Sequence, residues 1–330
     1  MPSKDQGTVQ SIMSSPDATI VFGPTGNVGS ATARCMRQHG TRVVLAMRDP
    51  RKPIPGLTAS QEAEAQFERV QADLTKPETI NSAVTQTKAK RAFIYVAFGT
   101  PDNMRASVTA LQSAGIEFVV LLSSDAIQGS PRDVSPADFV AWAHAQVEIN
   151  LEEIFGPERF VAVRPTYFAS NALWWKRMIS EGEVRMAYPN AKFDWISPED
   201  IGVVCGNLLA EGPRIFHDTN NNVIRLSGPE LISLGDAVRI IGRVIGQSIG
   251  ITEVDEQKGL EIYVDDFGIP ESVGNGMLQA MRISSSDGGE HVLYPSHAYE
   301  EAKDNVRKYA RGQFTTLHEW VAEHKDEFLT

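Results

Sequence analysis

The length, composition and charge of the chain are those of an ordinary folded protein. Of its 330 residues, 42% are hydrophobic and 22% are charged, which excludes disordered and fibrous classes. The formal charge of −11 argues against a nucleic-acid or anionic-membrane surface, because both need clustered Lys and Arg.

The cysteines and the apolar runs exclude further classes. Cys35 and Cys205 give neither a disulfide framework nor a metal-ligand spacing, and no run reaches the apolar length of a membrane span. We therefore expect a cytoplasmic protein with no metal site, no nucleic-acid partner and no membrane partner. Residues 1–17 are polar and are predicted to form a flexible N-terminal tail.

From residue 18, short β-branched runs alternate with longer helical patterns, which is typical of a parallel sheet built from βαβ units. Helices are predicted over 27–39, 61–66, 77–87 and 137–155, the first ended by Gly40 and the third begun by Pro77. Strands are predicted over 19–22, 42–47, 67–71, 92–97, 118–122 and 160–163. The pattern predicts an α/β fold with a doubly wound parallel Rossmann sheet, whose ligands bind beyond the carboxyl ends of the strands.

After residue 164 the alternation is interrupted and aromatic residues become frequent. A helix is predicted over 201–209, a strand over 223–226, and helices over 231–245 and 316–328. We predict a Rossmann domain over 18–165 and a smaller C-terminal α+β substrate-binding part over 166–330, with 197–228 returning to the Rossmann sheet. The aromatic residues are predicted to form a pocket wall: Tyr167, Phe168, Trp174, Trp175, Tyr188, Phe193 and Trp195.

A glycine-rich turn follows the first predicted strand. Gly23, Gly26 and Gly29 are spaced three apart where the strand meets a helix. The first permits a tight turn, the second lets backbone approach a pyrophosphate, and the third lets helix and strand pack closely. The turn therefore predicts a dinucleotide-binding site.

The end of the second predicted strand indicates which dinucleotide is bound. Arg48 stands where the ribose is read, and an arginine offers a charge-assisted fork to a 2′-phosphate. NADP(H) is therefore favoured over NAD, with Arg51 or Lys52 as a second phosphate contact. After the third strand, Asp73 either flanks the adenine together with Leu74 or caps a turn.

Several segments together resemble the NmrA-like family of atypical short-chain dehydrogenases/reductases. That family includes quinone reductases, a triphenylmethane reductase and non-catalytic redox sensors. The segments are GPTGNVG at 23–29, AMRDP at 46–50, QADLTKPETI at 71–80, ALQSAGIEFVVLLSS at 110–124, VRPTYFASN at 163–171, SPEDIG at 197–202, and the strand and helix at 223–246.

The resemblance implies a set of cofactor contacts. Arg48 would bind the 2′-phosphate, and Ser123 would also lie at the cofactor. The remaining residues are Gly23, Thr25, Gly26, Asn27, Val28 and Gly29 around the pyrophosphate, Asp73 and Leu74 near the adenine, Ala97 and Phe98 on the ribose side, and Pro165, Thr166 and Tyr167 at the nicotinamide.

The chain departs from typical short-chain dehydrogenases at their catalytic Tyr and Lys. No tyrosine lies between Ser123 and Tyr167, and no lysine lies between Arg91 and Trp175. His144 falls near the place of that lysine, on the same helix face as Glu148, and could donate or orient a proton.

His144 is equally well interpreted as a helix-surface or hydrogen-bonded histidine. Ser123, Asp125 and Tyr167 are the other catalytic candidates, with Tyr188 weaker, and each of them could instead serve packing or capping.

The sequence therefore predicts an NADPH-dependent reductase. Hydride would pass to an electron-poor small molecule, such as a quinone, iminium or enone, held in an aromatic-lined pocket of a monomer or homodimer. Positioning would supply most of the catalysis. Two alternatives stay open: a non-catalytic NADP(H)-binding redox sensor, and an isomerase or cyclase that retains NADP(H).

Overall fold

The computed structural model describes residues 17–217, 221–312 and 314–329. The predicted N-terminal tail, 1–17, therefore lies outside the described residues except for residue 17. Among the described residues, no helix is both long and apolar enough to cross a membrane.

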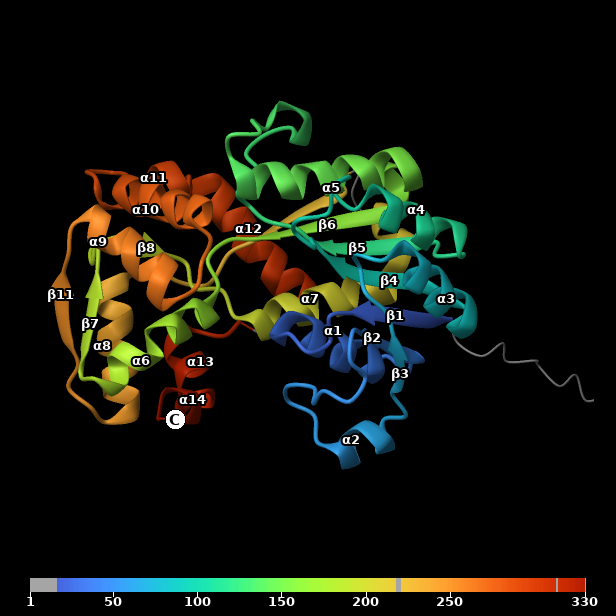
Figure 1. Ribbon diagram of the computed structural model, residues 1–330, viewed down its shortest axis with the longest axis horizontal. Helices are drawn as coiled ribbons and strands as arrows, with labels where there is room; N and C mark the ends of the chain where they lie inside the picture. The colour runs from blue at the N-terminus through green and yellow to red at the C-terminus, as the bar shows by residue number, and fades with distance from the viewer. Residues whose placement is uncertain (1–16, 218–220, 313, 330) are drawn as a thin grey trace, which may run out of the picture.

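A seven-stranded parallel sheet forms the centre of the larger lobe, in the order β3-β2-β1-β4-β5-β6-β9 (Figure 1). This order is that of a Rossmann fold and confirms the predicted fold class. The strands are β1 Ala18–Phe22, β2 Val43–Met47, β3 Glu68–Gln71, β4 Ala89–Tyr95, β5 Phe118–Leu122, β6 Phe160–Pro165 and β9 Val223–Leu226.

Only β4 departs clearly from its predicted range, beginning three residues earlier, at Ala89 rather than residue 92. The left-handed Lys88, with φ 54°, ends the preceding helix and turns the chain directly into the strand. Strand β9 lies beside β6, as expected for a segment that returns to the sheet. The domain boundary at 165 stays a prediction.

Helices cover both faces of the sheet, because alternate strand residues point to opposite sides. One face is covered by α1 Asn27–Gln38, α7 Pro198–Glu211 and α12 Ser296–Tyr309, and the other by α3 Pro77–Thr87, α4 Arg105–Ser113 and α5 Phe139–Phe155. The short α2 Ala59–Glu64 begins earlier than predicted, because Thr58 and Gln61 form a capping box.

Helices α1 and α7 are in unusually close contact. A Cβ atom at Gly202 would lie 2.4 Å from the Cβ of Ala31, and one at Gly206 would lie 2.6 Å from the Cβ of Cys35. These two glycines are one helical turn apart on α7, so any larger side chain there would push the helices apart.

The smaller lobe holds two short sheets, β7 with β11 and β8 with β10, surrounded by helices (Figure 1). The predicted helix over 231–245 begins later, because residues 232 and 233 pair with β8 and Ser233 caps α8. The elements are the 3-10 helix Ala169–Trp175, α6 Lys176–Ser180, β7 Glu183–Met186, β8 Lys192–Phe193, β10 Ile232–Ser233, α8 Leu234–Ile245, β11 Gly250–Glu253, α9 Glu256–Glu261, the π-helix Ile262–Asp266, α10 Glu271–Ser285, α11 Glu290–Leu293, α13 Leu317–Glu323 and α14 Lys325–Leu329.

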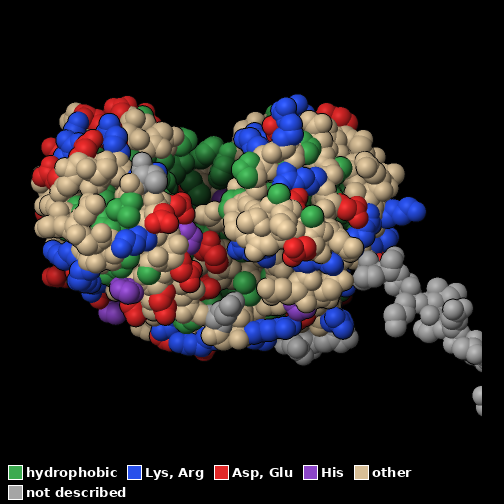
Figure 2. Space-filling view, turned by 90° about the horizontal axis from the view of Figure 1, so that it is seen from below, with side chains coloured by type: hydrophobic (Ala, Val, Ile, Leu, Met, Phe, Trp, Pro, Cys, Tyr) green, Lys and Arg blue, Asp and Glu red, His purple; other side chains and the backbone are tan. Residues whose placement is uncertain are grey.

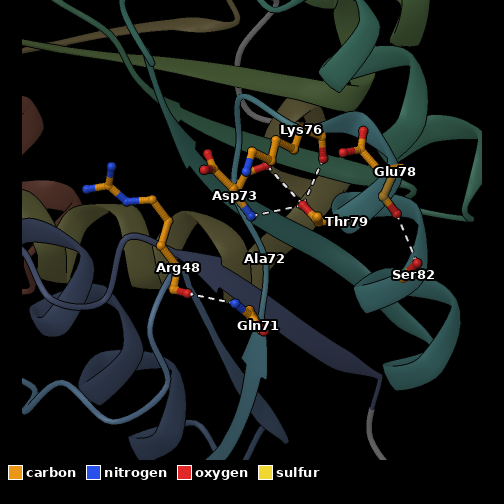
Figure 3. Close-up of a pocket in the computed structure, with 8 residues that line it drawn as sticks. All are labelled: Arg48, Gln71, Ala72, Asp73, Lys76, Glu78, Thr79 and Ser82. Atoms are coloured by element: carbon orange, nitrogen blue, oxygen red, sulfur yellow. Dashed lines mark hydrogen bonds between the residues drawn. The ribbon is translucent and has the colours of Figure 1, made fainter.

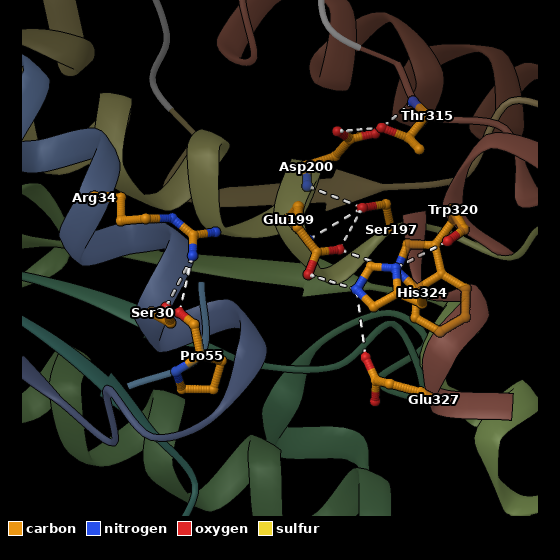
Figure 4. Close-up of polar contacts among 10 residues, drawn as sticks. All are labelled: Ser30, Arg34, Pro55, Ser197, Glu199, Asp200, Thr315, Trp320, His324 and Glu327. Carbon is orange, nitrogen blue, oxygen red and sulfur yellow. Dashed lines mark hydrogen bonds and ion pairs between the residues drawn. The ribbon is translucent and has the colours of Figure 1, made fainter. Parts of the chain in front are cut away.

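Polar contacts from the N-terminus of α7 hold the C-terminal helices in place (Figure 4). The Asp200 carboxylate accepts hydrogen bonds from the backbone N–H of Thr315 at 2.7 Å and from its hydroxyl at 3.0 Å. Glu199 accepts a hydrogen bond from the indole of Trp320 at 3.0 Å and lies 3.7 Å from Nε2 of His324. The predicted helix over 316–328 is thus divided at His324 into α13 and α14.

Candidate cofactor and substrate site

The glycine turn lies at the carboxyl end of β1, as predicted. Gly23 has φ +68°, and a Cβ at Gly29 would lie 2.4 Å from the carbonyl oxygen of Gly23. Gly26 is exposed, and its only neighbour would be that same oxygen, at 3.6 Å. The face of the turn at Gly26 is therefore open to a ligand. At Gly29, in contrast, the turn has no room for a side chain.

The N-terminus of α1 fits an anion. Its N-cap is Gly26, so no side chain accepts a hydrogen bond from the first backbone N–H groups of the helix. Thr25 is exposed beside it, Asn27 begins the helix, and Val28 is buried beneath. These residues fit the pyrophosphate of a dinucleotide.

Arg48 borders a cavity of about 510 Å³ beyond the ends of β2 and β3, together with Asp73 and Lys76 (Figure 3). The Arg48 side chain is exposed, which suits a contact with a 2′-phosphate. Arg51 is instead 90% exposed and paired with Asp49 at 2.9 Å, and it does not line this cavity. Lys76, which the sequence reasoning missed, is the second cation here.

Asp73 caps a turn, which is one of the two roles left open by the sequence, and its contact with the adenine stays a prediction. Its Oδ1 caps a turn by accepting from the backbone N–H of Thr75 at 2.9 Å and from its hydroxyl at 2.8 Å, and the residue also lines the Arg48 cavity. Burial alone would raise the pKa of Asp73, but the Thr75 bonds and the charges of Arg48 and Lys76 hold it below its usual value.

A smaller cavity of about 40 Å³ joins Asp73 and Leu74 to the glycine turn. It is also lined by Tyr95, whose ring atom Cε1 would lie 2.6 Å from a Cβ at Gly23. The sequence reasoning missed Tyr95, although its position on a strand next to β1 could have indicated it.

Ala97 and Phe98 follow β4 and lie between the cofactor turn and α5. Together with Phe139 they line a cavity of about 220 Å³. The Phe98 ring is 50% exposed, stacks on Phe139 with centroids 5.8 Å apart, and meets His144 edge-on at 5.7 Å. Phe98 and Phe139 thus form an exposed aromatic pair beside this cavity.

His144 does not have the properties of a cationic acid. Burial, with the nearby charge of Arg164, lowers its pKa to about 4, so the ring is neutral at pH 7. Its Nδ1 is buried and has no hydrogen-bond partner among the described residues. Glu148, on the same helix face, forms its bonds with other residues.

Glu148 is the centre of a buried polar network. It accepts a hydrogen bond from the Ser123 hydroxyl at 2.5 Å and a bidentate pair from Arg164, Nε to Oε1 at 2.9 Å and Nη2 to Oε2 at 2.5 Å. All three side chains are almost fully buried. The Ser123 hydroxyl therefore binds α5 inside the protein, and the network joins the ends of β5 and β6 to that helix.

Asp125 and the segment from Pro165 to Tyr167 border a large cavity of about 840 Å³, which we call the large cavity. The backbone N–H of Asp125 donates to the carbonyl of Pro165 at 3.0 Å. Burial raises the pKa of Asp125 to about 6, opposed by Arg225, whose Nε lies 3.3 Å from its Oδ1.

A fully buried carboxylate positions Thr166 and Tyr167. Asp194 accepts from the Thr166 hydroxyl, from the backbone N–H of Tyr167 at 3.1 Å and from the Tyr294 hydroxyl at 3.1 Å. Burial raises the pKa of Asp194 despite these bonds, which favour the charged form. The sequence reasoning missed this residue, because it stands just outside the SPEDIG segment at 197–202 and belongs to no motif itself.

The predicted aromatic wall is only partly correct. Tyr167 and Phe193 line the large cavity and stack with centroids 4.3 Å apart. The tryptophans pack inside the smaller lobe, and the Tyr188 hydroxyl donates to Glu256. The opposite wall of the large cavity is formed by α10 and by Tyr294, and the N-terminal residue of α5, Phe139, also lines the cavity. Figure 2 shows a hollow between the two lobes with hydrophobic side chains at its base.

No group of three or more His, Cys, Asp or Glu side chains that could hold a metal ion occurs among the described residues. Cys35 and Cys205 are buried free thiols, and burial raises the pKa of both. Neither has the character of a reactive thiolate.

Residues 16–321 match the model of the NmrA-like family. This chain belongs to that family. The match confirms the resemblance inferred from the sequence segments, including its extent over nearly the whole chain.

Three related proteins show what this NmrA-like chain is similar to. The nitrogen metabolite regulation-like protein bik4 of Gibberella fujikuroi is 34% identical over 319 residues, 92% of this chain and 94% of that protein. An NADPH-dependent quinone oxidoreductase of Escherichia coli, solved with NADPH, has a TM-score of 0.66 at 17% identity, covering 93% of this chain and 99% of the other. A Citrobacter triphenylmethane reductase solved with NADP(H) has a TM-score of 0.65 at 14% identity and the same coverage.

Proposed function

We propose that the chain binds NADP(H) and reduces an electron-poor small molecule by hydride transfer. The observation that carries the proposal is that the glycine turn, the Arg48 cavity and the large cavity all lie along the carboxyl edge of one Rossmann sheet. Two structures with the same fold, both reductases, contain this cofactor.

The cofactor would lie across the switch point of the sheet. Arg48 and Lys76 would hold the 2′-phosphate, and the N-terminus of α1 would hold the pyrophosphate. When bound, reduced nicotinamide supplies the hydride. The nicotinamide ring would be bordered by Pro165, Thr166 and Tyr167. Hydrogen bonds to the buried Asp194 would hold Thr166 and Tyr167 in place.

Positioning of the acceptor against the hydride donor would account for most of the rate of hydride transfer. Burial raises the pKa of Tyr167 well above its usual value, so its hydroxyl stays protonated, and residue 171, four positions later, is asparagine and not the lysine that would lower that pKa. His144 is neutral. An acceptor that needs little help from an acid suits these residues, because the two walls of the large cavity can hold it against the hydride donor.

A single-turnover experiment tests the proposal. The protein is loaded with one equivalent of NADPH and mixed with a panel of a quinone, an enone and an iminium salt, while absorbance at the nicotinamide band is followed. We expect oxidation by at least one acceptor, and deuterium from labelled NADPH in the product. No oxidation across the panel would refute the reductase.

A second function, a redox sensor that binds NADP(H) without chemistry, is favoured by the 34% identity to a nitrogen metabolite regulation-like protein. A sensor requires that the affinity for a protein partner differs between the NADPH and NADP⁺ forms. Measuring that affinity in both forms, alongside the turnover experiment, separates the two functions. An isomerase or cyclase would leave the label on the cofactor.

A further inference from the structure

The segment that follows β2 brings Arg48 to the cofactor site, and we call its residues 48–58 the β2 loop. Within these described residues the chain forms turns and bends without a helix or strand, and three of them are prolines. Arg48 itself is exposed. The position of its side chain at the cavity therefore depends on how firmly the backbone of the β2 loop is held.

Arg69 on β3 clamps the middle of the β2 loop. Its Nη1 donates hydrogen bonds to the backbone carbonyl oxygens of Pro50 and of Lys52, the second at 2.8 Å. Its Nε and Nη2 donate to the two carboxylate oxygens of Glu62 on α2, the second at 2.6 Å. One guanidinium therefore joins an edge strand of the sheet, the β2 loop and the following helix, and nearly all of its N–H donors are used.

The Arg69–Glu62 pair is partly shielded from water. The two side chains are 26% and 14% exposed, compared with 39% and 45% for the pair of Arg42 with Glu68 between the same two strands. Hydrogen bonds of a shielded pair are strengthened by the lower local dielectric and are less screened by salt. Only a planar guanidinium can make all of these contacts at once, so lysine cannot replace Arg69.

Gln71 holds the start of the β2 loop from the same face of β3. Val70 is buried in the core, so its neighbours Arg69 and Gln71 point to the opposite side of the strand. The Gln71 side-chain amide donates to the backbone carbonyl oxygen of Arg48 at 3.1 Å (Figure 3). Two side chains of one strand therefore fix the backbone at Arg48 and just beyond it.

The far end of the β2 loop is fixed to α1. The backbone carbonyl oxygen of Pro55 accepts a hydrogen bond from Nη1 of Arg34 at 2.9 Å (Figure 4). Ile54, beside it, is 3% exposed and packs in the core. The part of the β2 loop that is left for Arg69 to hold is therefore the part nearest to Arg48.

We propose that Arg69 is a positioning residue for recognition of the 2′-phosphate of NADP(H). By holding the carbonyl oxygens of Pro50 and Lys52, it keeps Arg48 at its cavity before the cofactor binds, so less conformational entropy is lost on binding. Arg69 does not line that cavity and acts only through Arg48. The proposal rests on the cofactor binding proposed above, with the 2′-phosphate at Arg48.

Fluorescence titration with NADPH and with NADH isolates recognition of the 2′-phosphate, because the two cofactors differ only in that group. The ratio of their affinities measures this recognition, and a loss of fold stability alone does not change the ratio. We expect Arg69→Met to lower the preference for NADPH about three- to tenfold, because the β2 loop must then be ordered when the cofactor binds.

Arg42 provides a matched control. Its Nε and Nη2 also form a fork on a glutamate, Glu68, at 2.6 and 2.7 Å, and its Nη1 donates to the backbone carbonyl of Thr87 at 2.7 Å. Arg42 precedes β2 and lies at the opposite end of that strand from Arg48. Arg42→Met should therefore leave the preference for NADPH unchanged.

A double variant tests whether Arg69 acts through Arg48. Arg48→Ala removes the phosphate contact, so adding Arg69→Met should then lower the affinity for NADPH no more than the affinity for NADH. Gln71→Ala keeps the test independent of how Arg69 affects folding, because Gln71 is exposed. It removes the hydrogen bond to the Arg48 carbonyl and should also lower the preference for NADPH, severalfold.

Two outcomes would overturn the proposal and leave the reductase intact. One is an unchanged preference for NADPH in folded Arg69→Met, or in Gln71→Ala if Arg69→Met does not fold. The other is an equal effect of Arg69→Met on that preference with and without Arg48. Failure of the reductase is a separate result, because it appears as bound NADPH that no acceptor oxidises, whereas these titrations require no turnover.

Discussion

Replacing Glu148 by Gln should destabilise the protein strongly. The carboxylate holds the buried Arg164 guanidinium through two hydrogen bonds and accepts a third from Ser123. The amide cannot balance the cation, whose side chain is only 2% exposed. Leaving one partner of a buried pair without its counter-charge costs about 3 to 5 kcal/mol, which in a chain of this size corresponds to a fall in Tm of roughly 4 to 8 °C.

Urea unfolding followed by circular dichroism measures this change, and the chain contains a matched control. Glu153 lies one turn further along α5 and pairs with Arg105 at 2.7 Å, but both side chains are largely exposed. Glu153→Gln should therefore shift the unfolding midpoint little. The double variant Glu148→Leu with Arg164→Met, which removes both charges, should recover roughly half of the loss.

The same substitution also tests the link between the network and the site. Because the network joins the ends of β5 and β6, Glu148→Gln should also weaken binding at the neighbouring Asp125 and Thr166. If Glu148→Gln unfolds within about 1 kcal/mol of the parent protein, the reasoning from burial is refuted.

Three further predictions follow from other contacts. Arg48→Ala should weaken NADPH binding about tenfold or more while changing NADH binding little, as fluorescence titration would show. Gly29→Ala should destabilise the fold, since its Cβ would lie 2.4 Å from a carbonyl oxygen, whereas Gly26→Ala should fold normally and lose cofactor affinity. The stabilising contribution of His324 should fall from pH 6 to pH 8, because the hydrogen bond and charge of Glu199 outweigh burial and raise the pKa of His324 in the folded state.

The sign of the pH effect follows from both partners. The contribution of His324 is complete below its unfolded pKa of about 6.5 and is lost as pH rises through the higher folded value. The pKa of Glu199 is lowered, so its contribution is present above about pH 4.5 and is lost as pH falls. The difference in Tm between the parent protein and His324→Gln should therefore shrink as the pH rises from 6 to 8, while the difference between the parent and the exposed His318→Gln should not change with pH.

For the Arg48 prediction, Arg51→Ala is the matched control, because Arg51 is engaged with Asp49 away from the cavity. Equal losses of NADPH affinity in the two variants would contradict the assignment of the 2′-phosphate to Arg48. An unchanged unfolding midpoint for Gly29→Ala, compared with Gly26→Ala, would contradict the steric argument for the glycine turn.

Most of the sheet could be predicted because β1, β2, β5 and β6 are apolar runs that are covered on both faces, so their composition alone identifies them as strands. The run at 118–122 matches β5 residue for residue, and the prediction for 223–226 matches β9. The start at Pro77 was predicted from its proline, whereas the starts of α2 and α7 were missed although a capping box and a serine cap mark them. Helix starts were also missed where pairing with another strand decides, as at Ile232 and Ser233.

The site was predicted less completely, because its residues are far apart in the sequence and are brought together only by the order of the strands in the sheet. Helical spacing placed His144 and Glu148 on one face, but only the fold brings Arg164 to Glu148 and leaves His144 neutral. Tyr95 and Asp194 stand outside any motif and reach the site through β4 and the turn after β8. The aromatic run follows no single period, so the sequence could not say which rings face the cavity.

The glycine contact between α1 and α7 determines where the molecule can bend. The N-terminus of α1 borders the cofactor turn, and the N-terminus of α7 holds the C-terminal helices, so these two distant features belong to one stiff body. A hinge between the lobes that passed through this contact would separate two helices packed with only small side chains between them. We therefore expect any opening of the large cavity to move α10 and α11, which line it from the smaller lobe.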